Sequence, residues 1–226
     1  MITYFWFELN LNFLLDTFAH KGKRKQLVEI LVKKGITNKK VLNAIGTIPR
    51  HLFMDSGFVD HAYIDKAFPI GADQTISQPF TVAKQTELLN LEKGSKILEI
   101  GTGSGFQTAV LIEMGMHVFS IERQNELFKK TKLFLPKLGY RAKKLIFGDG
   151  YKGFKEEAPF DGIVVTAGAP FVPKPLMSQL KIGGRLVIPI GSENQIMTLI
   201  TRISQTEFKK EEFGEFRFVP LLENKN

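Results

Sequence analysis

The chain has 226 residues, of which 43% are hydrophobic and 24% are charged, a composition typical of a globular protein with one well-buried core. It contains no cysteine, so disulfides, thiolate nucleophiles and cysteine–zinc sites are excluded. The net charge of +8 arises from short lysine groups between apolar helical positions. This pattern favours solvated helix faces over a nucleic-acid footprint, so no nucleic-acid partner is expected.

The amino-terminal residues 1–20 are expected to form an apolar extension. The first fifteen residues are strongly apolar and aromatic, but they are too few to span a bilayer. A secretory signal places positive charge before its apolar stretch, whereas here Lys21, Lys23 and Lys25 follow it. We therefore expect a cytoplasmic protein without stable membrane association, in which this extension is either a peripheral amphipathic helix or a partly disordered segment.

Residues 21–92 are predicted to form a helical region that carries a loop. Two helical patterns lie before Pro49, and either Thr37 or Asn38 can cap the second of them. The stretch Arg50 to Pro69 is predicted to be irregular. Pro79 suits the first position of a helix that runs to about Asn90.

Strand and helix patterns alternate in residues 93–226, which are predicted to join residues 21–92 in one compact domain. This alternation is typical of a Rossmann-like, doubly wound α/β sheet with mostly parallel strands. The predicted strands are Lys96–Ile100, His117–Ile121, Lys143–Phe147, Gly162–Val165 and Arg185–Ile190. The predicted helices are Gln107–Met114, Asn125–Leu138 and about Lys174–Leu180.

The pattern changes after Gly191. Two strand patterns, Ile196–Ile203 and Phe216–Leu222, follow each other with only a charged turn between them. Strands that are joined without a helix predict an antiparallel edge of the sheet.

The first predicted strand runs directly into Gly101, Gly103 and Gly105, and a helix follows. Glycines let the backbone approach a ligand, and the free N–H groups of a helix start attract an anion. A dinucleotide fingerprint requires GxGxxG, but Phe106 occupies its third glycine position. The pattern E-x-G-x-G-x-G therefore disfavours a nicotinamide dehydrogenase and is typical of S-adenosylmethionine (AdoMet) methyltransferases.

Two acidic residues follow the next two predicted strands. Glu122 stands where a carboxylate would accept hydrogen bonds from both hydroxyls of a ribose. Asp149, between Gly148 and Gly150, could accept from the exocyclic amine of an adenine. Each acid alone could be a helix cap or a turn residue, but their register after successive strands favours a cofactor that contains adenosine.

The loop after the fourth predicted strand, Thr166 to Pro173, carries no acidic or amide side chain. Enzymes that methylate exocyclic nitrogens of bases commonly carry such a side chain there, so methylation of an amine is disfavoured. The two prolines of this loop can also simply stiffen it.

Ser77 lies outside this sheet region, two residues before Pro79. Its hydroxyl is expected at the start of a helix, where N–H groups and the helix dipole favour a bound anion. From the residues alone, a simple helix cap at Ser77 or Gln78 is favoured over a substrate role.

The chain resembles the protein-L-isoaspartate O-methyltransferase family from about Asp16 to Leu222. The Thr-Ile-Ser-Gln-Pro element is specific to that family, whereas the glycine loop is shared by many methyltransferases. Gln85 and Ile182 depart from the family pattern. The landmarks that match are Pro49-Arg-His-Leu-Phe53, Gly71, Gln74 to Pro79, Thr86 to Leu89, Glu99 to Gly105, Gly148 to Gly150, Ala169-Pro170 and Gly183 to Leu186.

The resemblance implies a class I AdoMet-dependent fold, with AdoMet as the cofactor. It implies that Ser77 is the active-site serine, with Thr75 and Ile76 beside it on the substrate side. The residues that would bind the cofactor are Gly101, Gly103, Gly105, Glu122, Asp149 and Gly150. The expected partners are damaged polypeptides that contain L-isoaspartate, and a monomer is expected.

The implied reaction is transfer of a methyl group to the free carboxylate of isoaspartate, which initiates repair through a methyl ester and a succinimide. Such a carboxylate is already ionised at neutral pH, so no general base is required. The four histidines form no recognisable catalytic or metal-binding motif, and no metal is expected. The alternatives are a methyltransferase that acts on RNA or a small metabolite, and a nucleic-acid-binding module without catalysis.

Overall fold

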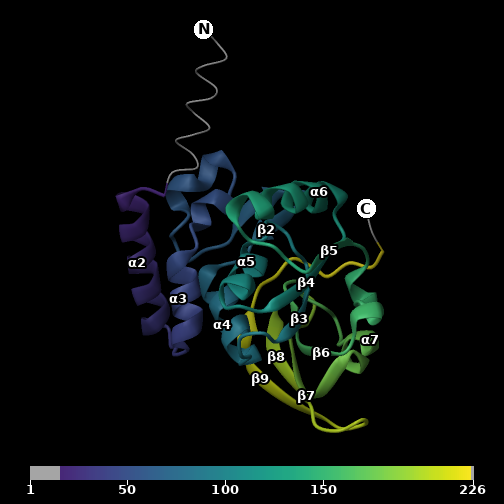
Figure 1. Cartoon of the computed structure of the whole chain (residues 1–226). Helices are drawn as coiled ribbons and strands as arrows, with labels where there is room; N and C mark the ends of the chain where they lie inside the picture. Colours follow the sequence, from purple (N-terminus) through teal and green to yellow (C-terminus); the bar gives the residue numbers. More distant parts are fainter. Residues whose placement is uncertain (1–15, 225–226) are drawn as a thin grey trace.

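The structure is a computed structural model that describes residues 16–224, so the expected extension at residues 1–15 lies outside the described residues. A seven-stranded sheet carries helices on both faces, and a two-stranded hairpin lies beside it (Figure 1). The α-helices are α2 (Phe18–Lys33), α3 (Lys39–Thr47), α4 (Pro79–Leu89), α5 (Phe106–Glu113), α6 (Asn125–Phe134) and α7 (Lys174–Ser178). The strands are β1 (Phe68–Gly71), β2 (Gln74–Ile76), β3 (Lys96–Ile100), β4 (His117–Glu122), β5 (Lys144–Phe147), β6 (Phe160–Val165), β7 (Leu180–Ile190), β8 (Gln195–Arg202) and β9 (Phe208–Phe216). The 3-10 helices are η1 (Arg50–Phe53), η2 (Ser56–His61), η3 (Leu135–Leu138), η4 (Gly150–Lys152) and η5 (Lys155–Glu157).

The strands of the large sheet are ordered β5-β4-β3-β6-β7-β8-β9. All neighbours from β5 to β7 pair in parallel, whereas β8 and β9 pair antiparallel to their neighbours. The strands β4 and β5 thus lie in chain order on one side of β3. The chain then returns to the other side of β3, where β6 to β9 follow in order. The predicted Rossmann-like sheet with an antiparallel C-terminal edge is confirmed.

Apolar side chains cover both faces of the sheet, because successive strand residues point to opposite sides. On one face, Leu98 and Ile163 pack with Leu176 of α7. On the other face, Ile97 and Val164 pack with apolar residues of α4 and α5. Burial on both sides explains why the central strands are continuous apolar runs in the sequence.

The helices that precede the sheet share a core with it. Asn38 caps α3 by accepting a backbone N–H at 2.9 Å, which confirms one of the two predicted caps. Leu27 of α2 belongs to the same buried cluster as Phe106 of α5. This shared core supports our proposal that residues 21–92 and 93–226 form one compact domain.

The stretch predicted to be irregular after Pro49 contains regular elements. Within Arg50 to Pro69, residues 50–53 and 56–61 form the 3-10 helices η1 and η2, and β1 begins at Phe68. β1 pairs with β2, which follows this stretch, as an antiparallel hairpin. These elements have three to six residues each. Such lengths are too short for hydrophobic periodicity to distinguish them from a loop.

The last strand lies earlier in the chain than predicted. β9 occupies Phe208–Phe216, where the sequence suggested a charged turn. Of the predicted strand Phe216–Leu222, only Phe216 belongs to a strand. β9 is an edge strand, and charged side chains on such a strand discourage pairing with other chains. Lys209 and Lys210 form ion pairs along it with Glu211 and Glu212 at 3.2 and 2.7 Å, so the charge pattern marks a solvated strand.

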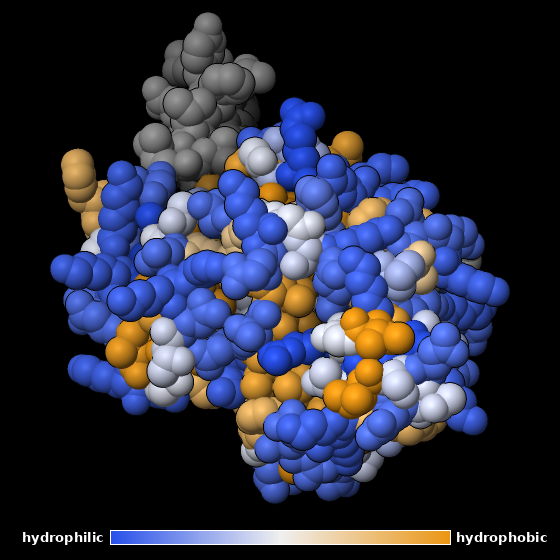
Figure 2. Space-filling view, turned by 60° about the horizontal axis from the view of Figure 1, so that its bottom comes forward, coloured by the Kyte–Doolittle hydropathy of each residue, from blue (hydrophilic) through white to orange (hydrophobic). Residues whose placement is uncertain are grey.

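The surface is mostly polar on the face shown in Figure 2, where hydrophobic side chains gather in small patches among hydrophilic ones. Within residues 16–224, no helix combines the length and apolar character needed to cross a membrane.

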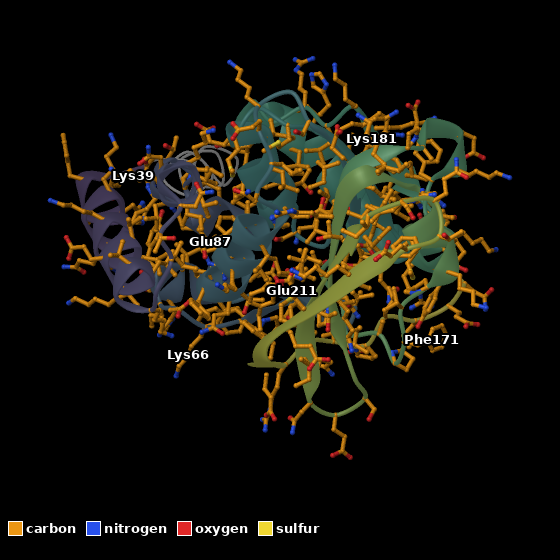
Figure 3. The ribbon with its side chains drawn as sticks, turned by 90° about the horizontal axis from the view of Figure 1, so that it is seen from below. Lys39, Lys66, Glu87, Phe171, Lys181 and Glu211 are labelled. Atoms are coloured by element: carbon orange, nitrogen blue, oxygen red, sulfur yellow. The ribbon has the colours of Figure 1, made fainter. Side chains whose placement is uncertain are left out.

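Glu87 of α4 connects that helix to the start of α3 (Figure 3). Its Oε1 accepts the backbone N–H groups of Thr37 and Asn38 at 2.8 and 2.9 Å, and Lys84 lies 3.3 Å from its other oxygen. Burial opposes ionisation of Glu87, but these hydrogen bonds and the charge of Lys84 outweigh it. The pKa of the Glu87 carboxyl therefore lies below its ordinary value.

We expect Glu87→Gln to lower the free energy of unfolding by about 1–2 kcal/mol at neutral pH, because the amide is a weaker acceptor for the two N–H groups. The lowered pKa means that this stabilisation is complete above the unfolded-state pKa and is lost as pH falls through the folded-state value. Urea unfolding from neutral to acidic pH would measure both effects. Glu92→Gln is the matched control, because Glu92 forms only an exposed pair with Lys40. An equal loss in both variants, or an unchanged pH dependence in Glu87→Gln, would contradict this assignment.

Candidate active site

The main cleft lies at the carboxyl ends of β3 and β6, where the order of the strands reverses. Ligands of open α/β sheets bind at such a reversal, because the loops after the two strands diverge there. The lining comes from the loops that follow the parallel strands, from the end of β2, from the start of α5 and from the C-terminal segment. These residues are Gln74 to Ser77, Val82, Ile100 to Ser104, Phe106, Gln107, Ile121 to Arg123, Gly150, Thr166, Ala167 and Val219 to Leu222.

The predicted site residues divide into two groups. Gly105 and Asp149 do not line the main cleft. The structure brings together in it Thr75, Ile76, Ser77, Gly101, Gly103, Glu122 and Gly150.

Gly101 turns the chain out of β3 with a φ of 94°, a conformation that favours glycine. A Cβ atom at this position would lie 2.4 Å from the hydroxyl oxygen of Thr166. That hydroxyl donates to the carbonyls of Ile100 and Gly101, at 2.9 and 2.7 Å. The hydroxyl of Thr166 therefore holds the turn in place, and Gly101 contributes only backbone atoms to the cleft.

Gly105 allows close packing at the start of α5. It precedes α5 with a φ of 84°, and a Cβ atom there would lie 2.9 Å from side-chain atoms of Thr131 and Leu135. Gly105 thus allows α6 and the turn after it to pack against the start of α5. Its contribution to cofactor binding remains a prediction.

Glu99, on β3, is buried behind the glycine loop. Its Oε2 accepts the hydroxyls of Thr108 and Ser120 at 2.5 and 2.6 Å. The Ser120 oxygen also lies 2.6 Å from the hydroxyl of Thr102 in the loop. Burial raises the pKa of Glu99 to about 8, so at neutral pH this group is mostly a neutral acid that ties β3, β4 and the loop together.

Glu122 forms a wall of the main cleft at the end of β4. Its two carboxylate oxygens accept the backbone N–H groups of Gly103 and Gln124, each at 2.8 Å. The side chain is 5% exposed, so these bonds hold the carboxylate in one orientation. Each oxygen retains a lone pair, and two adjacent oxygens of this kind fit the diol of a ribose.

Asp149 is placed differently from Glu122. Its Oδ1 accepts the N–H of Tyr151 at 2.9 Å, and its side chain borders a neighbouring hollow with Tyr151 and Phe171. The next residue, Gly150, is the one that lines the main cleft. A contact of Asp149 with an adenine therefore remains a prediction.

A second hollow, the side hollow, adjoins the main cleft. Its lining includes the start of α4, the loop between β7 and β8, and residues 215–219. Four residues line both spaces, namely Thr75, Ser77, Thr166 and Val219. Ser77 is therefore one of the residues at the junction of the two spaces.

The start of α4 does not offer the free anion site that the sequence suggested. Asp65, which is 7% exposed at its side chain, accepts the N–H of Phe80 in the first turn at 2.8 Å. The amide of Gln78 donates to the same residue, at 3.1 Å to its carboxylate. A carboxylate of the chain itself therefore already lies at the positive end of this helix.

Several residues of the site were not identified from the sequence. The predicted C-terminal strand instead crosses the cleft, because Gly168 exchanges backbone hydrogen bonds with Val219 and Leu221, at 2.8 and 2.7 Å. Gln107, in the first turn of α5, also lines the cleft, and its buried carbonyl oxygen has no hydrogen-bond partner among the described residues. Its place directly after the glycine loop is the signal that could have identified it.

A group of possible metal ligands lies away from the main cleft. Ligand atoms of Asp16, His20 and His51 lie within 4.8 Å of one another, although His51 is distant in the sequence from the other two. Both oxygens of Asp16 also accept hydrogen bonds from Arg24 at 3.0 and 2.9 Å. This guanidinium opposes binding of a cation, so the expected absence of a metal stays a prediction.

Comparison with known proteins agrees with this geometry. A family model described as protein-L-isoaspartate(D-aspartate) O-methyltransferase matches residues 22–226. Protein-L-isoaspartate O-methyltransferase of Christiangramia forsetii is 70% identical over 93% of this chain and 99% of its own length. The protein of the same name from Flavobacterium psychrophilum is 68% identical over the same shares.

Solved structures support the same assignment. One protein-L-isoaspartate O-methyltransferase has a TM-score of 0.79 and 32% identity, and the match covers 87% of this chain and 65% of that one. A Plasmodium falciparum structure in complex with S-adenosyl-L-homocysteine has a TM-score of 0.76 and 28% identity, over 88% of this chain and 98% of that one. The chain belongs to the protein-L-isoaspartate(D-aspartate) O-methyltransferase family.

Proposed function

We propose that this protein transfers the methyl group of AdoMet to the free carboxylate of L-isoaspartyl residues in damaged polypeptides. The observation that carries this proposal is the position of Ser77, which lines both the main cleft and the side hollow. AdoMet would occupy the main cleft, and the isoaspartyl residue would reach Ser77 from the side hollow. Family membership and the names of the relatives support the same reaction.

The residues of the main cleft fit AdoMet. The side-chain-free turn at Gly101 and Gly103 allows a ligand to approach the backbone closely, and Glu122 presents two oriented oxygens to a ribose. When bound, AdoMet supplies an electrophilic methyl group, whose bond to sulfur breaks as a carboxylate oxygen forms the new ester bond. The apolar side chains of Ile121 and Leu221 in the lining would exclude water beside the nucleoside.

No proton has to be removed in this reaction, because the acceptor carboxylate is already ionised at neutral pH. The protein must chiefly align two bound molecules, and such alignment can lower a barrier by about 7–11 kcal/mol. The hydroxyl of Ser77 would donate a hydrogen bond to one carboxylate oxygen and so direct the other toward the methyl group. Thr75 and Ile76 would form the adjoining wall on the substrate side.

The carbonyl carbon of the methyl ester is more open to attack than that of the carboxylate, because the ester can release methanol. The neighbouring backbone nitrogen can therefore form a bond to this carbon, lose its proton and close a succinimide without further help from the enzyme. Hydrolysis of the succinimide returns a fraction of the damaged residues to ordinary aspartate. We further propose that the protein acts as a cytoplasmic monomer without a nucleic-acid partner. The lack of cysteine fits the reducing cytoplasm, and the scattered lysines fit the absence of a nucleic-acid partner.

A methyl-transfer assay on matched peptides tests the proposed substrate. A peptide with L-isoaspartate should be methylated, and the same peptide with ordinary L-aspartate should not. The transferred label should leave as methanol at mildly alkaline pH, because esters are labile there whereas methylated bases are stable. Label that stays bound, or equal methylation of both peptides, would refute the proposal.

Ser77→Ala should lower kcat/KM for the isoaspartyl peptide about tenfold to a hundredfold, since a hydrogen bond to a charged group contributes about 1.5–3 kcal/mol. The dissociation constant of AdoMet, measured by calorimetry, should change little. Ser178→Ala is the matched control, because Ser178 is exposed and its hydroxyl donates to the carbonyl of Pro175 within α7. Equal losses of turnover and AdoMet affinity in Ser77→Ala would assign Ser77 to the cofactor side.

Glu122→Ala should raise the dissociation constant of AdoMet at least about tenfold, because two charge-assisted hydrogen bonds to the ribose are lost. Glu113→Ala, at an exposed acid of α5, serves as the control for a lost negative charge. Calorimetry that finds the same AdoMet affinity in Glu122→Ala and the parent protein would remove Glu122 from the proposed ribose site.

A further inference from the structure

The side hollow contains two charged side chains, Glu215 and Arg217, among the described residues that line it. Both side chains are exposed. Neither side chain forms a hydrogen bond or an ion pair with another residue in the range 16–224. Their charges are therefore available to a molecule that enters the hollow.

The two charges are ordered along one extended segment. Glu215 lies opposite Ile196, one residue before the last pair of β9 and β8, Phe216 with Gln195. Arg217 and Val219 follow Glu215 at intervals of two residues. Val219 belongs to both the side hollow and the main cleft, so Arg217 is the charge next to the junction, and Glu215 is one step farther from it.

The rest of the hollow offers little to hold an anion. The start of α4 would be the other positive feature, but Asp65 already accepts the N–H of Phe80 there. The ring of Phe80 lies parallel to that of Phe216, with centroids 6.1 Å apart, and forms an apolar wall. Arg217 is thus the cationic side chain of the hollow within the described residues.

We propose that Arg217 selects the anionic acceptor, by attracting the isoaspartyl carboxylate toward Ser77, and that Glu215 opposes it. This inference rests on the proposed function and adds a specificity-determining residue to it. The attraction has a consequence for turnover. The carboxylate carries a negative charge and the methyl ester does not, so Arg217 would hold the substrate more strongly than the product.

The test is a comparison of three variants with an isoaspartyl peptide as substrate. Arg217→Gln should raise KM about threefold to fivefold with a smaller change in kcat, because an exposed charge pair contributes up to about 1 kcal/mol. Arg217→Lys should retain most of the parent KM. Glu215→Gln should lower KM about twofold, since it removes a repulsion of similar kind.

Lys209→Gln is the matched control, because Lys209 lies on β9, carries the same charge as Arg217 and lines neither space. It should leave KM unchanged. Added salt should raise KM of the parent protein and have less effect on Arg217→Gln, because salt screens exposed charges. The dissociation constant of AdoMet should be the same in all variants.

Two results would overturn the inference. One is an Arg217→Gln protein with the KM of Lys209→Gln, and the other is a shift of KM in the same direction for Arg217→Gln and Glu215→Gln. In either case a parent protein that still methylates the isoaspartyl peptide leaves the proposed function intact. A parent protein that does not methylate this peptide refutes the proposed function instead.

Discussion

The site depends on the reversal of strand order between β3 and β6. Because β4 and β5 extend the sheet on one side of β3 and β6 to β9 extend it on the other, the loops after β3 and β6 leave the sheet in different directions. A space opens between them at the carboxyl ends of these strands. Thr166, at the start of the loop after β6, joins the two loops by donating to the carbonyls of Ile100 and Gly101, and it lines the space between them.

Rigidity of the cofactor side follows from buried polar contacts. Glu99 holds hydroxyls from α5 and β4, and Glu122 is held by two backbone N–H groups. A loop that is ordered before the ligand arrives loses little entropy on binding. The substrate side is built instead from β2, the start of α4 and the C-terminal segment, which lie far apart in the chain. A reaction that needs alignment rather than proton transfer suits such an arrangement of two facing surfaces.

Local sequence patterns predicted the parts of this protein whose physics is local. The apolar runs identified the parallel strands, because strands buried on both faces need apolar side chains throughout. Asn38 and Pro79 marked helix starts, since capping and a fixed φ act within one turn. Glycines at positive φ marked the turn after β3. Glu122, the last residue of β4, was assigned to the site because parallel strands end at one edge of the sheet.

Only the tertiary structure decided which of these residues face the main cleft. Gly105 packs against α6, and Asp149 borders another hollow, because packing between distant segments sets these positions. Charge alone could not separate a turn from the solvated edge strand β9. Residues 217–222 cross the cleft through backbone bonds with Gly168, and Asp65 fills the start of α4. The sequence by itself determined the order of elements and the chemistry available to the site. The packing of segments far apart in the chain determined which functional side chains come together in the cleft. The sequence does not reveal this, because such contacts leave no periodic signal in the residues that make them.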